Sequence, residues 1–180
     1  LTVAAIGKTA FGTDKVIPVA DVKALDPEVV TVNDSLYFDS LELSLKRIPN
    51  AQHMYTVAKK AIGKWAKLFI AVKIVESGND GDNSIYARRD NNLTGMRQPR
   101  VRKTMSLGAT KNKYARYASW YDCMLDFGMY LDGMERGFIK KNHRPVRNSQ
   151  EMVKYLYGKY NTHPVWRKRT LYVLKNFKWK

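Results

Sequence analysis

The chain has 180 residues, 44% of them hydrophobic, and carries 32 Lys and Arg against 16 Asp and Glu, for a formal net charge of +16. This length and hydrophobic content fit one domain with a buried core, and they exclude a disordered chain and a membrane span. The positive charge favours polyanionic partners such as nucleic acid, anionic lipid or an anionic cell envelope. The single cysteine, Cys123, excludes an internal disulfide and a cysteine-based zinc cluster.

The first part of the chain differs in composition from the rest. In residues 1–33, small and β-branched residues alternate with Gly and Pro, which predicts an extended arm or a small pair of strands. Residues 33–35 offer helix caps ahead of a periodic apolar run that Pro49 ends. We therefore expect an N-terminal extended arm over residues 1–33 and one domain over residues 34–180. Because the chain begins with Leu rather than Met, we also expect a fragment, a processed product or a trimmed chain.

Helical spacing of apolar residues recurs through the rest of the chain. Beyond a first helix that ends near residue 48, it predicts helices over residues 51–62, 64–77, 118–138, 149–157 and 165–177. Gly63 separates the first two of these, and Ser119 and Ser149 are the predicted N-caps of two others. The residues from Gly137 to Arg147 are expected to form a basic connector.

Two segments between these helices are expected to be non-helical. Residues 78–92 are polar and rich in turn formers, and their Asp and Asn spacing resembles a calcium-binding loop. No Glu occurs between residues 78 and 117, so the last ligand of that motif is missing, and we expect no metal and no cofactor. In the basic segment that starts at Arg97, residues 104–106 and 114–117 are predicted strands of a hairpin. This hairpin is either an exposed basic surface without a specific ligand or one wall of a cleft for a polymeric substrate.

The most informative stretch is the apolar run that starts at Leu68, because it ends in a carboxylate, Glu76. Burying a charge without a partner is costly, so this carboxyl group is either paired or kept partly protonated. A raised pKa is what a general acid needs near neutral pH. The sequence alone leaves open whether Glu76 is such an acid or a salt bridge at a helix end.

Four short segments, in this order along the chain, carry a resemblance to a known family. They are residues 69–78, which end in Glu-Ser-Gly; residues 91–96, Asn-Asn-Leu-Thr-Gly-Met; residues 114–120, Tyr-Ala-Arg-Tyr-Ala-Ser-Trp; and residues 157–164, Tyr-Gly-Lys-Tyr-Asn-Thr-His-Pro, with the helix after them. Over about residues 51–177 the chain resembles the glucosaminidase family of peptidoglycan hydrolases, glycoside hydrolase family 73. Two departures stand out: Thr94 replaces the family's usual aromatic residue, and residues 79–82 replace its usual Trp-Gly-Lys-Ser.

The resemblance implies a mainly α, lysozyme-like α+β domain with a small β-hairpin lobe. It implies an endo-β-N-acetylglucosaminidase that cleaves the β-1,4 bond next to N-acetylglucosamine in peptidoglycan, with Glu76 as general acid. The usual scheme adds a second carboxylate. Among Asp80, Asp82 and Asp90 we expect only Asp90 to be a candidate, since the other two fit a structural role in the loop. A substrate-assisted route, in which the N-acetyl group is the nucleophile, needs no second carboxylate.

The resemblance also nominates residues that contact the substrate. Tyr117 matches the family's tyrosine on the far wall of the cleft, where it would orient the N-acetyl group or stabilise charge; the alternative is a core aromatic with a satisfied hydroxyl. Asn91, Asn92 and Gly95 belong to the turn that borders the cleft, and the two Asn residues can hold it through side-chain to backbone bonds. The candidates for stacking on sugar faces, each of which can instead be structural, are Tyr86, Tyr114 and Trp120.

The positive charge is compatible with more than one partner. A basic hydrolase would be held near peptidoglycan glycan strands and anionic cell-envelope polymers, with an attraction that fades as salt rises. Such a protein would be secreted, periplasmic or virion-associated, as a phage endolysin is, and a larger virion or secretion assembly would be a further partner. The alternatives are a basic nucleic-acid-binding module, whose cations contact phosphates, and a structural virion module that keeps the fold without activity.

Overall fold

The computed structural model describes residues 48–80 and 83–180, which belong to one compact unit of the chain, Ser40–Lys180. The expected N-terminal arm and the helix expected before Pro49 lie outside the described residues, so the proposed boundary at residues 33–34 stays a prediction. None of the helices within the described residues is both long and apolar enough to cross a membrane.

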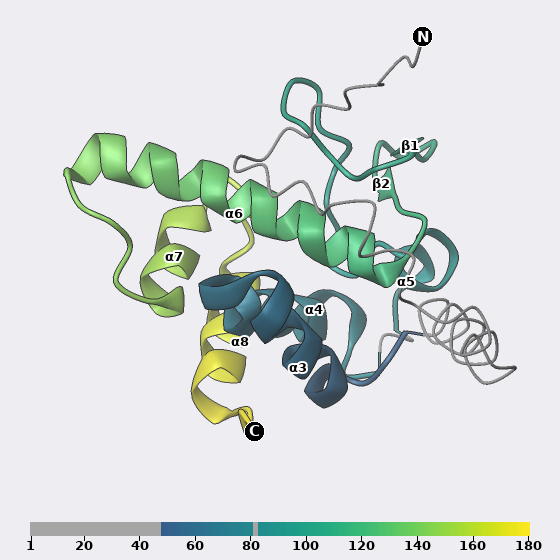
Figure 1. Cartoon of the computed structure of the whole chain (residues 1–180), viewed down its shortest axis with the longest axis horizontal. Helices are drawn as coiled ribbons and strands as arrows, with labels where there is room; N and C mark the ends of the chain where they lie inside the picture. The colour runs from purple at the N-terminus through teal and green to yellow at the C-terminus, as the bar shows by residue number, and fades with distance from the viewer. Residues whose placement is uncertain (1–47, 81–82) are drawn as a thin grey trace, which may run out of the picture. The chain divides into compact units, whose positions relative to one another are not determined.

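The domain is mainly helical, with one two-stranded antiparallel sheet, and thus has the α+β composition that the sequence predicted (Figure 1). Its elements are α3 (Ala51–Ala61), the 3-10 turn η2 (Gly63–Trp65), α4 (Ala66–Ser77), α5 (Ile85–Asp90), β1 (Gly108–Ala109), β2 (Ala115–Arg116), α6 (Trp120–Asn142), α7 (Ser149–Leu156) and α8 (Pro164–Asn176). The predicted helices around residues 51–62, 64–77 and 165–177 are confirmed, and the break at Gly63 falls where η2 begins.

Helix α4 is the centre of the domain, and α3, α6, α7 and α8 all pack against it. Its side chains are buried on nearly every face from Ala66 to Lys73, which a surface helix with one apolar stripe would not show. Figure 1 shows α6 as the long helix that runs across this group. The apolar composition of α4 therefore follows from its central position.

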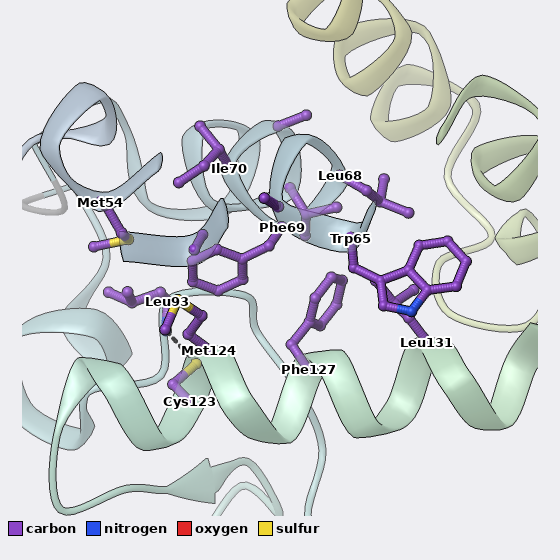
Figure 2. Packing of buried hydrophobic residues seen from close by; sticks show 14 of the residues in the cluster. Met54, Trp65, Leu68, Phe69, Ile70, Leu93, Cys123, Met124, Phe127 and Leu131 are labelled. Atoms are coloured by element: carbon purple, nitrogen blue, oxygen red, sulfur yellow. Dashed lines mark hydrogen bonds between the residues drawn. The ribbon is translucent and has the colours of Figure 1, made fainter. Parts of the chain in front are cut away.

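The core between α4 and α6 is built from aromatic and aliphatic side chains (Figure 2). The rings of Phe69 and Phe127 lie 5.9 Å apart, in a tilted arrangement. Cys123 is fully buried beside them, and its Sγ accepts a hydrogen bond from the backbone N–H of Leu93 at 3.4 Å. Burial raises the pKa of the Cys123 thiol to about 12, so this group is neutral and structural, as the sequence suggested.

One predicted loop contains a helix. Residues 78–92 were expected to be non-helical throughout, but α5 occupies part of the segment. The side chain of Ser84 accepts the backbone N–H of Ala87 at its start, and Asn91 ends it in the left-handed region, at φ +50°. Six residues between a good N-cap and an Asn that tolerates this conformation suffice for one short helix, despite their polarity.

The hairpin is displaced from the predicted strands. The second strand, β2, lies inside the expected residues 114–117, but β1 forms at Gly108–Ala109 rather than at residues 104–106. The earlier residues are held elsewhere, since the backbone N–H of Met105 donates to the carboxylate of Asp126 on α6 at 3.0 Å. The sequence pattern did not reveal that the Asp126 side chain would bind a backbone N–H of the predicted strand.

Two helix ends also differ from expectation. Helix α6 continues into the expected connector as far as Asn142, because Phe138 is buried against Tyr155 and the left-handed His143 supplies the C-cap. Helix α7 is capped by Asn148, whose side chain accepts the N–H of Glu151, rather than by Ser149. A tertiary contact therefore extends α6 beyond its predicted end, and a neighbouring residue rather than the predicted one caps α7.

A buried carboxylate on α6 anchors the hairpin lobe, which we define as residues 97–117. Asp126 receives two hydrogen bonds from the guanidinium of Arg102, at 2.8 and 2.7 Å, and one from the hydroxyl of Tyr117 at 2.8 Å. Burial alone would raise the pKa of Asp126, but hydrogen bonds from Arg102, Thr104 and Tyr117 outweigh it and lower that pKa. An ionised group on α6 thus holds the lobe to the helical body.

Candidate active site

The backbone around Glu76 is held from several sides. Glu76 lies in the last turn of α4, half-buried, and the neighbouring Ser77 hydroxyl donates to the backbone carbonyls of Lys73 and Leu93, both at 2.9 Å. The buried ammonium of Lys73 donates to the carbonyls of Gly78, at 2.8 Å, and of Asn79. These bonds fix the end of α4 to the turn at residues 91–96, and so set the position of the carboxyl group.

Three residues from other segments face the Glu76 carboxyl group. A Cβ atom on Gly95 would lie 3.3 Å from Glu76 Oε2, so the carboxylate approaches the bare backbone of this glycine at φ +69°. The amide of Asn161 and the indole of Trp166 lie on the side of the closing segment, residues 157–166. The structure therefore brings the first, second and fourth family-like segments together at one carboxyl group.

Burial raises the pKa of Glu76 above its ordinary value, while hydrogen bonding to Asn161 and Trp166 works against this rise. The groups that favour the charged form are neutral donors rather than a lysine or arginine. The indole N–H of Trp166 is buried and makes no hydrogen bond of normal geometry, so its support of the charged carboxylate is incomplete. A carboxyl group in this environment retains its proton to a higher pH than an exposed glutamate.

Tyr160 ties the closing segment to the turn. Its hydroxyl donates to the backbone carbonyl of Thr94, and its ring packs against Phe127, Tyr130 and Trp166 at centroid distances of 5.8, 5.8 and 5.3 Å. Burial, and then the charge of Glu76, raise the pKa of Tyr160 well above its ordinary value. The backbone of Thr94 thus contacts Tyr160, an aromatic residue from another segment of the chain.

A groove of about 540 Å³ lies next to this site: Gly95, which adjoins the Glu76 carboxyl group, is among its lining residues, although Glu76 itself is not. Its walls come from the start of the lobe, from α6 and from the closing segment. It is lined by Gly95, Met96, Arg97, Gln98, Pro99, Arg100, Val101, Arg102, Tyr130, Gly133, Met134, Lys159 and Tyr160. None of these described residues is acidic, whereas four carry positive charge. The predicted basic segment therefore does form one wall of a cleft.

The two asparagines of the turn make the expected side-chain to backbone bonds. The amide of Asn91 donates to the carbonyls of Tyr117 and Ala118, at 3.2 and 3.1 Å. The amide of Asn92, which is buried, donates to the carbonyls of Met96 and Ala115, both at 2.8 Å. These contacts hold the turn to the lobe, while contact with a substrate stays a proposal for Asn91, which is only half-buried.

The other two predicted catalytic residues have partners of their own. Tyr117 is buried, and its hydroxyl donates to Asp126; burial, followed by the charges of Cys123 and Asp126, raises its pKa. Asp90 is also buried, and it pairs with Arg89 at 3.2 Å, while its backbone carbonyl accepts the N–H of Tyr117. Neither residue is among those that line the groove, so a direct role for either one stays a proposal.

The three aromatic candidates for sugar stacking are not brought together at the groove. Tyr86 and Tyr114 stack on one another with ring centroids 4.2 Å apart, and the guanidinium of Arg97 lies 4.1 Å from the Tyr114 ring. Trp120 is buried at the start of α6 and meets Tyr121 edge-on. Tyr86 and Tyr114 line a separate, shallow surface depression with Arg97, so stacking on sugar there remains a proposal.

Comparison with known proteins identifies the family of this chain. The family model described as Glucosaminidase, mannosyl-glycoprotein endo-beta-N-acetylglucosaminidase, matches residues 52–178. The chain belongs to the Glucosaminidase family. This glucosaminidase is accordingly a glycoside hydrolase, and the resemblance found in its four segments is confirmed.

Two solved structures are similar to this glucosaminidase. The catalytic domain of the autolysin Auto from Listeria monocytogenes is 14% identical, with a TM-score of 0.47, and the match covers 88% of this chain and 90% of that chain. The glycoside hydrolase domain of FlgJ from Salmonella typhimurium is 17% identical, with a TM-score of 0.45, over 70% of this chain and 82% of that one. A search of curated protein sequences finds no significant match.

The sequence analysis missed three residues of the site: Tyr160, Asn161 and Trp166. It identified residues 157–164 as a family-like segment but gave this segment no role. No local pattern marks Asn161, because its amide comes to lie beside Glu76 only through the fold.

We expect Asn161→Ala to move the high-pH limb of the activity profile upward. Asn161 favours the charged form of Glu76, so its loss raises the pKa of Glu76 further, and the protonated acid persists to higher pH. The measurement is kcat/KM against pH for the wild type and the variant, with Thr162→Ala, at the exposed neighbouring position, as control. A limb that stays in place or moves to lower pH would show that Asn161 does not act on Glu76.

Proposed function

We propose that this glucosaminidase is a peptidoglycan hydrolase in which Glu76 protonates the glycosidic oxygen of the β-1,4 bond next to N-acetylglucosamine. The observation that carries the proposal is the position of Glu76: a carboxyl group with a raised pKa, beside a groove and next to the bare backbone of Gly95. Protonation of the leaving oxygen is the step that such a group performs, since an alkoxide is a poor leaving group.

The surroundings of Glu76 support both halves of a proton transfer. Burial raises the pKa of the carboxyl group and so favours its protonated form before the reaction, as a general acid requires. Once the proton has moved to the sugar oxygen, the charged carboxylate is stabilised by donors that are already in place, the amide of Asn161 and the incompletely used N–H of Trp166. This arrangement lowers the energy of the state that forms during bond cleavage.

The second group of the reaction is the substrate's own N-acetyl oxygen in this proposal. The chain has no Asp or Glu from Asn91 to Tyr121, Asp80 is exposed, and Asp90 pairs with Arg89. In the substrate-assisted route, the acetamido oxygen bonds to C1 as the C1–O bond breaks, and the leaving oxygen takes the proton of Glu76. Water then attacks C1, returns a proton to Glu76 and reopens the ring of the intermediate.

Tyr117 has an indirect place in this scheme. Its hydroxyl is bound to Asp126, and the same carboxylate holds Arg102, one of the groove residues. We propose that Tyr117 and Asp126 position the lobe wall of the groove, and that contact of Tyr117 with the N-acetyl group would require this hydrogen bond to open. Asp90 is the remaining candidate for a second carboxylate if the substrate-assisted route fails.

The site of action follows from the substrate. An enzyme that cleaves cell-wall glycan works outside the cytoplasm, and we propose a secreted, periplasmic or virion-borne enzyme, in the last case as part of a larger assembly. The net charge of +16 would hold it near anionic envelope polymers. Gel-shift measurements with duplex DNA at physiological salt test the nucleic-acid alternative: sequence- or structure-selective binding without any glycan cleavage would favour that alternative.

The products of digestion test the reaction. Mass spectrometry of digested sacculi is expected to show reducing N-acetylglucosamine ends, whereas 1,6-anhydro-muramic ends would identify a lytic transglycosylase instead. Proton NMR of the first product formed is expected to show the β anomer, because two displacements at C1 retain configuration. Initial formation of the α anomer would contradict the substrate-assisted route and require a second carboxylate that positions water.

A further inference from the structure

The groove is lined by positively charged side chains, which are not needed to bind an uncharged glycan. Arg97, Arg100 and Lys159 are exposed and line it from two segments that are far apart in the sequence. Arg102 is paired with Asp126, and the guanidinium of Arg97 lies over the Tyr114 ring and donates to the carbonyl of Asn112. Arg100 and Lys159 remain as exposed cations of the groove that have no acidic partner within the described residues. Uncharged sugar hydroxyls are bound well by amides and hydroxyls, but Gln98 is the only amide side chain among the described residues of the groove.

The groove is also apolar between its cations. Met96 and Met134 line it beside the ring of Tyr130, and the side chain of Val101 is 98% exposed at its edge. A surface that alternates cations with small apolar contacts is complementary to an extended peptide that carries free carboxylates and small apolar side chains. In peptidoglycan, the peptides that have this character are attached to the sugar next to N-acetylglucosamine, close to the bond that Glu76 would protonate.

We infer that this groove binds the carboxylate-bearing stem peptide beside the scissile bond, so that the enzyme selects glycan strands that still carry peptides over bare strands. Arg100 and Lys159 contact the peptide carboxylates, and Val101 and Met134 contact its apolar side chains. This inference rests on the proposed peptidoglycan hydrolase function and adds the determinant of its specificity. Gly95 and Tyr160 join the peptide groove to the catalytic carboxyl group.

A graded series of substrates tests the inference. Chito-oligosaccharides have no carboxylate, strands stripped of peptide by an amidase have one lactyl carboxylate per disaccharide, and intact strands have several. We expect kcat/KM to rise along this series, and the advantage of intact strands to shrink as ionic strength increases. The quantity to compare is the ratio of kcat/KM for intact and peptide-free strands.

Charge removal in the groove identifies the residues responsible. Arg100→Gln and Lys159→Gln are each expected to lower the intact-to-bare ratio by about 2–5-fold, the usual effect of one exposed ion pair, and the double variant by more. Lys168→Gln, which removes an exposed charge on α8 outside the groove, is the matched control and should keep the wild-type ratio. Thermal unfolding confirms that each variant is folded, since all three side chains are exposed.

The outcomes separate this inference from the proposed function. The inference would be overturned if the wild type cleaved intact and peptide-free strands at the same rate and the double variant left the ratio of their kcat/KM values unchanged. The hydrolase proposal would still stand. Equal losses on both substrates would assign the cations to general attraction for the polymer and would likewise overturn it. Failure of the wild type to cleave any strand would refute the proposed function itself.

Discussion

Glu76→Gln is expected to abolish clearing of peptidoglycan sacculi while leaving the domain folded. Glutamine has nearly the same shape, so the contacts with Gly95 and Asn161 survive, but it has no acidic proton for the leaving oxygen. Loss of a general acid lowers the rate by about 10²–10⁴-fold. The measurement is the initial rate of appearance of reducing ends from purified sacculi, with circular dichroism to confirm the fold.

Two comparisons show whether the lost group is an acid. Aryl glycosides with acidic leaving groups need little protonation, so the variant should retain much more of its activity on them than on sacculi. Glu151→Gln is a control at a carboxylate that pairs with Arg144 on the surface, and it should keep wild-type activity. Equal clearing by wild type and Glu76→Gln would remove Glu76 from the proposed role.

The same substitution has an expected effect on stability with a definite sign. The folded-state pKa of Glu76 is raised, so its contribution to stability is complete below the unfolded pKa, near 4.5, and is lost as pH rises through the folded value. Glu76→Gln does not ionise, so its melting temperature should exceed that of wild type near pH 7 and approach it near pH 4. If Glu76→Gln were less stable than the wild type at pH 7, burial would not raise the pKa of Glu76 as described.

Asp126→Ala is expected to give the largest loss of stability among single substitutions at the site. Its carboxylate accepts bonds from the Arg102 guanidinium, the Tyr117 hydroxyl and the Met105 backbone N–H, and removing it leaves all three donors without this acceptor. Breaking a buried pair in this way costs about 3–5 kcal/mol, and we expect the lower end because Arg102 keeps 27% of its side-chain exposure. Urea unfolding measures the difference.

Controls and pH dependence separate this effect from a general loss of charge. Asp80→Ala, at an exposed position in the loop, should change the free energy of unfolding by less than about 0.5 kcal/mol. The pKa of Asp126 is lowered in the folded protein, so its stabilisation is present above the unfolded value near 3.8 and is lost as pH falls through the folded value. The gap between wild type and Asp126→Ala should therefore narrow in acid. A pH-independent gap would argue against an ionised Asp126.

The sequence was sufficient to predict the helix that carries Glu76 and to identify the family. An apolar run that ends in Glu-Ser-Gly can be read locally, since burial on all sides of α4 requires apolar residues at nearly every position. The same holds for Ser119, whose side chain caps α6 as predicted. Such features depend on neighbours in the chain.

The features that sequence reasoning missed depend on partners far away along the chain. Residues 104–106 do not form a strand, because Asp126, more than twenty positions later, binds the backbone N–H of Met105. Asn161 looked like an ordinary loop residue, and only the fold places its amide beside Glu76. The closing segment was visible as a motif, but its contribution to the electrostatics of the acid was not.

The most direct test of the central claim is the structure of Glu76→Gln with a bound peptidoglycan fragment. The account predicts that the oxygen joining N-acetylglucosamine to the next sugar lies within hydrogen-bond distance of the side chain at position 76, with the stem peptide in the groove beside Arg100 and Lys159. A fragment bound on another face, with position 76 away from any glycosidic oxygen, would contradict it.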